Sequence, residues 1–232
     1  MQTAIYDKLI NKLPEIKEES VALAKIGCTF CAYGSYPKIA LFWQQENENG
    51  EITALFSLMD GNLTLFAQGV NEELRLFIKA LSPATVFAEA ETAEMLGIKG
   101  EQVNVVRFLC GGNYEPQKSA DLKRIFALFK KDFNINGDEF IADLSHRLRH
   151  GAAFCVLKEK GAAVVQTAGE NALITGICVE SEDRKQGLGS EILGDIKNSF
   201  SGTLYACCED SVLPFYLKNS FEKTGTAIIG RI

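Results

Sequence analysis

The sequence of 232 residues is long enough for one large domain or two modest ones. Hydrophobic residues make up 47% and charged residues 23%, which is ordinary for a globular protein and excludes a disordered chain, a fibre and collagen. The net charge of −6 disfavours an extended nucleic-acid footprint, and no apolar run approaches the roughly 18 residues of a membrane helix. Seven scattered cysteines without a secretory signal predict a cytoplasmic protein with reduced thiols.

The first half of the chain is predicted to begin with helices and to continue with a three-stranded meander. Ile5, Leu9 and Leu13 are spaced along one helical face, and Pro14 suits the first turn of a second helix that includes the apolar residues at 21–26. Farther along, short or alternating apolar runs are separated by turns rich in Asn and Gly, which is typical of antiparallel strands. The elements expected after these two helices are strands at 39–43, 52–58 and 63–67, a helix at 74–81, a strand at 84–88, a helix at 92–96 and a strand at 103–110.

The second half repeats this order after Gly111–Pro116, where two glycines, an asparagine and a proline indicate a domain boundary. We therefore expect an α/β (α+β) protein with two tandem lobes, 1–112 and 113–232, each a mixed, mostly antiparallel sheet flanked by helices. The elements expected in the second lobe are helices at 122–129 and 140–148, strands at 152–157, 162–167 and 172–179, a helix at 187–200, a strand at 203–207, a helix at 213–218 and a strand at 227–229.

The residues that indicate chemistry follow the strand that ends at Val179. The chain passes through a short acidic turn into Arg184–Ser190 and then directly into an amphipathic helix. Gly187 and Gly189 let the backbone approach a ligand closely, and N–H groups at the start of a helix point toward an anion. The helix dipole and the two basic residues that begin the segment add to the attraction. This order of strand, glycines and helix predicts a phosphate-binding loop.

Two common phosphate-binding loops are excluded by the residues themselves. There is no Gly-Lys-Ser/Thr, so the segment is not a P-loop, and Ile192 stands where a Rossmann loop has its third glycine. The segment instead resembles the acyl-CoA pyrophosphate loop of the GCN5-related N-acetyltransferase (GNAT) superfamily. That loop reads Arg/Gln-x-x-Gly-x-Gly/Ala, and Arg184, Gly187 and Gly189 match it.

A second element of the same superfamily occurs farther along the chain. Members often carry an Asn, an Ala, a Tyr and a Gly-Phe pair across their fourth helix, and Tyr216 and Phe221 match the Tyr and the Phe. Three positions differ from this pattern, because the Asn, the Ala and the Gly are replaced by Glu209, Val212 and Ser220. The first lobe has no such loop and looks like a degenerate GNAT-like lobe, an arrangement similar to FR47-like and glycine N-acyltransferase-like members.

The resemblance implies an N-acetyltransferase that uses acetyl-CoA, or another acyl-CoA, and no metal. The loop amides would hold the pyrophosphate, and the strand before the loop would pair with the pantetheine arm and polarise the thioester carbonyl. A small-molecule or peptide amine would attack directly, and Tyr216 would protonate the leaving thiolate as the catalytic acid. The residues that the resemblance assigns to acyl-CoA binding are Ile177, Cys178, Val179, Arg184, Lys185, Gln186, Gly187, Leu188, Gly189 and Ser190.

Other interpretations stay open from the sequence. Because the second motif is imperfect, the protein could instead be a non-catalytic acyl-CoA-binding or regulatory module, or a scaffold whose first lobe mediates homodimerisation. Tyr216 could be an ordinary core aromatic residue. The segment Ser145–His150 is expected to form a solvated basic helix face, although His146 and His150 share a face as a zinc pair would.

The cysteines are read as structural. Cys28 and Cys31 have the spacing of a metal pair, but no second pair accompanies them, so we expect plain thiols. Cys178 and Cys207 lie on expected strands and are predicted to be buried.

Overall fold

The computed structural model describes residues 4–6, 19–113, 115 and 119–231. These residues pack into two compact units. The first unit combines Met1–Val106 with Cys207–Leu213 and Lys223–Ile232, and the second combines Arg107–Ala206 with Pro214–Glu222. In the part of the chain described, no helix is long and apolar enough to span a membrane.

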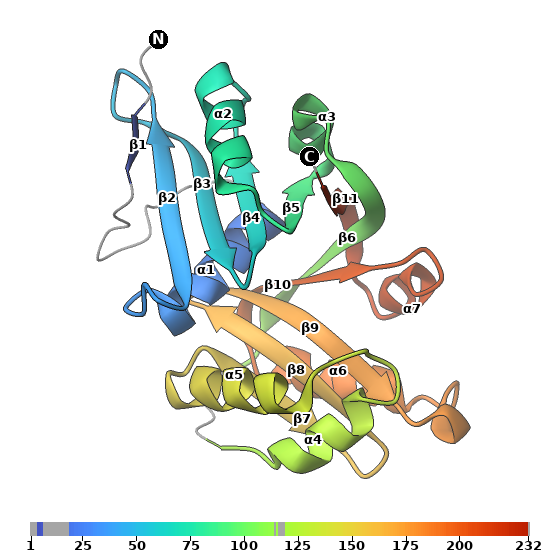
Figure 1. The fold of residues 1–232 in the computed structure, drawn as a ribbon. Helices are drawn as coiled ribbons and strands as arrows, with labels where there is room; N and C mark the ends of the chain where they lie inside the picture. The colour runs from blue at the N-terminus through green and yellow to red at the C-terminus, as the bar shows by residue number, and fades with distance from the viewer. Residues whose placement is uncertain (1–3, 7–18, 114, 116–118, 232) are drawn as a thin grey trace. The chain divides into compact units, whose positions relative to one another are not determined.

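The first unit is built on a meander of antiparallel strands that is extended by parallel and antiparallel neighbours. Its strands follow the order β1-β2-β3-β4-β5-β11-β6, in which β4 runs parallel to β5 and β11 runs antiparallel to β5. Helices α1 and α2 cover opposite faces of the sheet (Figure 1). The elements are β1 (Ala4–Tyr6), α1 (Val21–Tyr33), β2 (Ala40–Glu46), β3 (Ile52–Met59), β4 (Asn62–Ala67), α2 (Glu72–Leu81), β5 (Thr85–Glu89), α3 (Ala90–Leu96), β6 (Lys99–Gly111) and β11 (Glu222–Arg231).

One hydrophobic cluster of this unit lies between the sheet and α2. Trp43, Phe56 and Leu65 occupy neighbouring positions in the register of β2, β3 and β4, so they share one face of the sheet. Leu74 and Ile78 lie four residues apart on α2 and pack into the same cluster. All five side chains are buried, because the apolar stripe of the helix and the apolar face of the sheet cover each other.

The second unit has the same plan. Its strands follow the order β6-β10-β9-β8-β7, with an antiparallel β7-β8-β9 meander and a parallel β9-β10 pair. Helices α4 and α5 lie on one face of the meander and α6 on the other (Figure 1). The elements are α4 (Leu122–Phe129), α5 (Gly137–Arg149), β7 (Ala153–Leu157), β8 (Gly161–Ala168), β9 (Asn171–Val179), a 3-10 turn (Ser181–Asp183), α6 (Leu188–Asn198), β10 (Ser201–Cys208) and α7 (Leu213–Lys218).

The architecture confirms the predicted fold class, two repeats of a mixed, mostly antiparallel sheet with flanking helices. One prediction is wrong at the start of the chain. Residues 4–6 form a strand that pairs with β2, not the start of a helix, and the rest of the predicted helix at 5–13 lies outside the described residues. Helical spacing cannot reveal this pairing, because the open edge of β2 offers backbone hydrogen bonds that only the tertiary structure brings within reach.

The two packing units divide the chain differently from the two predicted lobes. The second unit begins at Arg107, whereas the second lobe was predicted to begin at residue 113. Strand β11 was expected to close the second lobe, but it pairs with β5 of the first unit. The register aligns Ala227 with Glu89 and Gly230 with Val86. The last strand therefore returns to the first half of the chain.

Candidate acyl-CoA site

The predicted phosphate-binding loop begins where β9 ends and runs into α6. Gly187 is the N-terminal cap of α6, with φ of +97°, a backbone conformation that favours glycine. No side chain caps the helix there, and the first helical hydrogen bond runs from the N–H of Glu191 to the carbonyl of Gly187. The N–H groups of Leu188, Gly189 and Ser190 therefore have no acceptor within the helix. This end of α6 is suited to bind an anion.

Gly189 is needed for close packing rather than for an unusual backbone angle. A β-carbon at this position would lie 3.2 Å and 3.3 Å from two atoms of the Phe215 ring. Phe215 belongs to α7, the helix that also carries Tyr216. The glycine therefore lets the start of α6 and the side chain from α7 come together.

Strand β9 leaves one edge open just before the loop. Its register with β8 extends to Val179, whereas its register with β10 runs only from Asn171 to Ile174. A bulge separates the two parts, because Val164 pairs with Gly176 and Val165 with Ile174, which leaves Thr175 as an extra residue. Beyond the bulge, β9 has a paired neighbour on one side.

The direction of the backbone groups along this edge follows from two hydrogen bonds. The N–H of Glu180 donates to the carbonyl of Lys160 at 2.9 Å, so the neighbouring residue Val179 directs its N–H and C=O away from β8. The same alternation turns those of Ile177 to the open side. The carbonyl of Val179 on that side accepts a hydrogen bond from Nε of Arg184 at 2.9 Å, in agreement with this assignment.

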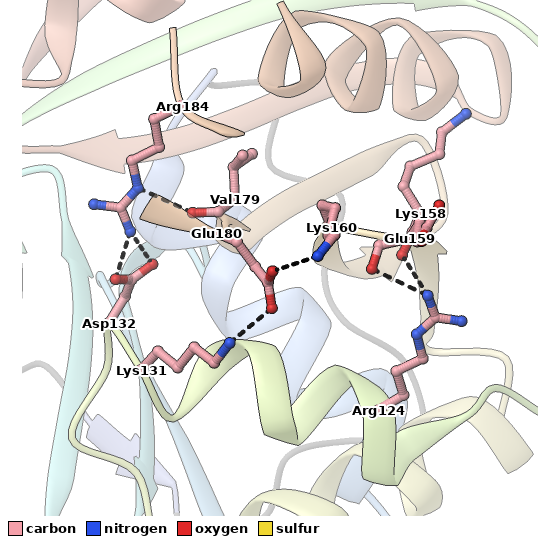
Figure 2. Close-up of polar contacts among 9 residues, drawn as sticks. All are labelled: Arg124, Lys131, Asp132, Lys158, Glu159, Lys160, Val179, Glu180 and Arg184. Carbon is pink, nitrogen blue, oxygen red and sulfur yellow. Dashed lines mark hydrogen bonds and ion pairs between the residues drawn. The ribbon is translucent and has the colours of Figure 1, made fainter. Parts of the chain in front are cut away.

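A network of charged side chains holds the end of β9 in place (Figure 2). The guanidinium of Arg184 contacts both carboxylate oxygens of Asp132, at 2.5 Å and 2.6 Å. Glu180 accepts hydrogen bonds from Lys131 at 2.7 Å and Lys160 at 3.2 Å. These bonds hold the pKa of Glu180 below its ordinary value, and the bond from Lys131 has the largest effect. The turn after α4 and the β7–β8 hairpin therefore brace the strand from which the loop departs.

The side chain of Arg184 is already engaged within the protein, which is not expected of an arginine that is free to bind a phosphate. The carboxylate of Asp132 already balances the charge of Arg184, and the carbonyl of Val179 accepts a hydrogen bond from the Nε of the same guanidinium. Lys185 is exposed, with φ of +62°, and in the described part of the chain it has no ion-pair partner. Of the two basic residues in the loop, Lys185 is thus the one whose charge is not compensated.

The first turn of α6 also carries an acidic residue whose charge is neutralised. Lys158 lies 2.7 Å from a carboxylate oxygen of Glu191 and 2.7 Å from one of Asp195. Hydrogen bonds to Asp195 and then Glu191 raise the pKa of Lys158 to about 12. The nearby Arg124 donates to the carbonyls of Lys158 and Glu159, which fixes the hairpin that carries this lysine. Glu191 therefore adds little repulsion for an anion at the helix terminus.

Tyr216 is buried, with 6% of its surface exposed. Its ring lies edge-on between Phe215 and Phe221, with centroids 5.3 Å and 5.1 Å away. Ser220, at the glycine position of the superfamily motif, has φ of +65°. The backbone at this position keeps the left-handed conformation for which glycine is the usual residue, although the side chain differs.

The structure also describes the segment Ser145–His150, for which a basic helix face and a zinc pair were considered from the sequence. The Ser145–His150 segment is not a fully solvated basic face, because Arg147 is 4% exposed and contacts Asp143 at 2.9 Å. The rings of His146 and His150 lie 4.3 Å apart. Among the described residues, no group of three or more His, Cys, Asp and Glu residues is arranged to hold a metal ion.

The two strand cysteines differ in burial. Cys178 is buried as expected, whereas Cys207 on β10 is partly exposed. Burial raises the pKa of both thiols to about 11, so neither is a reactive thiolate at neutral pH.

Sequence reasoning did not identify Lys131, Asp132 and Lys160 as neighbours of the loop. Asp132 lies 52 positions before Arg184, and nothing in the spacing of charged residues indicates the contact. Acidic and basic residues near helix ends are common, so only the packing of α4 against β9 reveals these partners.

Comparison with known proteins supports the fold, not a specific activity. No family model and no curated sequence matches the chain. Solved structures do match. This chain has the GNAT fold. A GNAT-family acetyltransferase from Colwellia psychrerythraea aligns over 100% of both chains, with 11% identity and a TM-score of 0.51. A GCN5-related N-acetyltransferase from Sphaerobacter thermophilus covers 82% of this chain and 80% of its own, with 12% identity and a TM-score of 0.54. A Drosophila protein covers 90% and 89%, with 12% identity and a TM-score of 0.58.

Proposed function

We propose that the second unit is an acyl-CoA-dependent N-acyltransferase, with acetyl-CoA as the expected donor and a small-molecule or peptide amine as the acceptor. The observation that carries the proposal is the uncapped start of α6 next to the open edge of β9. A pyrophosphate needs the first feature, and the amide groups of a pantetheine arm can pair with the second as an added strand does. The free thiols support the expected cytoplasmic compartment.

The corresponding helix of the first unit has the opposite character, which favours the second unit as the acyl-CoA site. The side chain of Asn71 caps α2 by accepting from the N–H of Leu74 at 2.8 Å. Two glutamates follow in the first turn, and the buried amide of Gln45 donates to Asn71 and to Glu73. A phosphate at this terminus would meet an occupied donor and two like charges.

The proposed reaction requires four events. The acceptor amine attacks the thioester carbon, the new C–N bond forms, the C–S bond breaks, and the thiolate takes up a proton while the amine loses one. The N–H of Ile177 or Val179, directed to the open side of β9, would stabilise the negative charge that develops on the thioester oxygen. Tyr216 would supply the proton to sulfur, and its ring is held rigidly by two phenylalanines.

Calorimetric titration with acetyl-CoA tests the binding site. We expect Lys185→Glu to weaken binding, because the substitution places a negative charge beside the phosphates without removing a contact within the described residues. Lys123→Glu, on the exposed face of α4, makes the same change in net charge and should leave the affinity unchanged. No binding at millimolar acetyl-CoA, or equal weakening by both variants, would refute the site.

A second candidate function is a non-catalytic acyl-CoA-binding module, which the burial of Tyr216 and the replacement of the motif's Asn by Glu209 favour. The Tyr216→Phe variant separates the two functions because it removes only the hydroxyl. An enzyme that uses this acid should lose about 10²–10⁴-fold in kcat on a panel of amines, with its acetyl-CoA affinity retained. A binding module would show no turnover in either form.

A further inference from the structure

The last turn of α6, at the end of the helix away from the loop, carries Lys197. Its Nζ lies 3.8 Å from the centre of the Phe108 ring on β6 and 5.1 Å from the centre of the Phe221 ring. The same ammonium group donates a hydrogen bond to the carbonyl of Asn219. The two rings also contact each other, with centroids 5.6 Å apart. Because aromatic faces attract a cation, Lys197 connects α6 both to β6 and to the residues that follow α7.

The charge of Lys197 is compensated by aromatic rings and a backbone carbonyl, not by a carboxylate. Its side chain is half-buried, and among the described residues it forms no ion pair. Burial lowers the pKa of Lys197 below the ordinary value of a lysine. Lys218, in the last turn of α7, is by contrast exposed and makes no side-chain hydrogen bond or ion pair within the described chain. The two lysines therefore offer a matched comparison of a held charge and a solvated one.

Helix α7 ends beside Lys197 in a Schellman motif. Ser220 has left-handed backbone, and its N–H donates to the carbonyl of Leu217 at 3.0 Å. The N–H of Phe221 donates to the carbonyl of Tyr216 at 3.1 Å. Such a motif is often accompanied by an apolar contact between these two last residues, and here their ring centroids are 5.1 Å apart. The orientation of the Tyr216 ring therefore depends on how α7 ends.

Contacts with α6 support α7 at both of its ends. A helix of six residues is not stable by itself, so its position is set by the residues packed around it. Near the start of α6, Gly189 allows the close approach of Phe215, and in its last turn Lys197 donates to Asn219. Carbonyl groups at the end of a helix have no partner within the helix, so a donor from outside stabilises that end. Lys197 thus fixes the segment that orients Tyr216.

We propose that Lys197 is a positioning residue for Tyr216. This role rests on the function proposed above, in which the Tyr216 hydroxyl gives its proton to the leaving thiolate. Lys197 does not touch the substrate and exchanges no proton. Its ammonium group holds Phe221 and the carbonyl of Asn219, and Phe221 holds the Tyr216 ring in the orientation from which the hydroxyl reaches the sulfur. A displacement of about 1 Å in a reacting group costs about 10²-fold in rate, so loosening the end of α7 lowers kcat.

Steady-state kinetics of the full chain test this role, with acetyl-CoA and the amine of the panel that the parent protein acetylates fastest. Lys197→Met keeps the length of the side chain but removes its charge and its donor. We expect kcat to fall about 10–100-fold, with the dissociation constant for acetyl-CoA unchanged, because the phosphate-binding loop lies at the other end of α6. Lys197→Arg keeps a cation and donors and should recover most of the lost kcat. Lys218→Met should behave like the parent protein.

A double-mutant cycle with Tyr216→Phe separates positioning from a general effect on the fold. Without the hydroxyl there is no proton donor to position, so Lys197→Met should lower the kcat of the Tyr216→Phe protein far less than that of the parent. Thermal melting and acetyl-CoA titration establish that each variant is folded. The role is overturned if Lys197→Met has the kcat of Lys218→Met, if the double variant loses the product of the two single effects, or if the loss lies in acetyl-CoA affinity.

The same measurements separate this role from the proposed function. If the parent protein acetylates no amine, or if Tyr216→Phe keeps the parental kcat, the proposed function fails and the role of Lys197 fails with it. A loss of kcat in Tyr216→Phe together with an unaffected Lys197→Met protein overturns the role of Lys197 alone.

Discussion

Replacement of Gly187 by alanine gives the sharpest test of the loop. The residue has φ of +97°, and no described atom lies within 4 Å of the position that a β-carbon would take. The substitution therefore adds backbone strain without a steric clash. A residue with a β-carbon in left-handed backbone costs roughly 1–2 kcal/mol.

If the loop of the Gly187→Ala protein leaves the left-handed conformation when no ligand is bound, the backbone strain lowers the affinity for acetyl-CoA. Acetyl-CoA would then have to restore the left-handed backbone in order to reach the N–H groups at the start of α6, and would lose that energy from binding. At about 1.4 kcal/mol per factor of ten, the dissociation constant should rise about 5–30-fold. If the loop does not relax, the same 1–2 kcal/mol is lost from the free energy of unfolding.

Gly194→Ala is the matched control, because it makes the same substitution inside α6, where the new methyl group again meets no described atom within 4 Å. It should stabilise the protein by about 0.5–1 kcal/mol and leave the affinity for acetyl-CoA unchanged. Calorimetric titration and urea unfolding of both variants measure the two quantities. A Gly187→Ala protein with unchanged affinity and unchanged stability would refute the account of this loop.

Three further predictions concern the scaffold of the two units. Gly176→Ala would bring a β-carbon to 2.5 Å from the Phe129 ring, so we expect a loss of about 1–3 kcal/mol in urea unfolding, partly restored by Phe129→Leu. Glu180 has a pKa below its ordinary value, so its contribution to stability is present above the unfolded-state pKa and is lost as the pH falls through the folded-state pKa. The melting temperature of Glu180→Gln should therefore lie below that of the parent at neutral pH and approach it below about pH 4, and an equal difference at both pH values would contradict the ion-pair account. Asn71→Ala should cost about 1 kcal/mol through loss of the α2 cap, and an unchanged urea midpoint would contradict this role.

Local patterns in the sequence were sufficient to predict the repeated order of elements and the position of the glycine-containing loop between β9 and α6. Alternating apolar residues and glycine-containing turns determine where the meanders lie, because strand and turn preferences act over a few neighbouring residues. The motif Arg184-x-x-Gly187-x-Gly189 was recognisable for the same reason. The left-handed angle at Gly187 and the close approach of Phe215 to Gly189 are the physical demands that the two glycines meet.

The tertiary structure alone decided features that depend on partners distant in the chain. Arg184 is balanced by Asp132, 52 residues away, and the last strand pairs with β5 rather than with the unit that precedes it. The pairing of β9 with β10 stops at Ile174, which leaves the open edge that the proposed function needs. A sequence of 232 residues with net charge −6 could not reveal that Lys197 contacts Phe108 and the end of α7, because side chains far apart along the chain meet only when the fold brings them together.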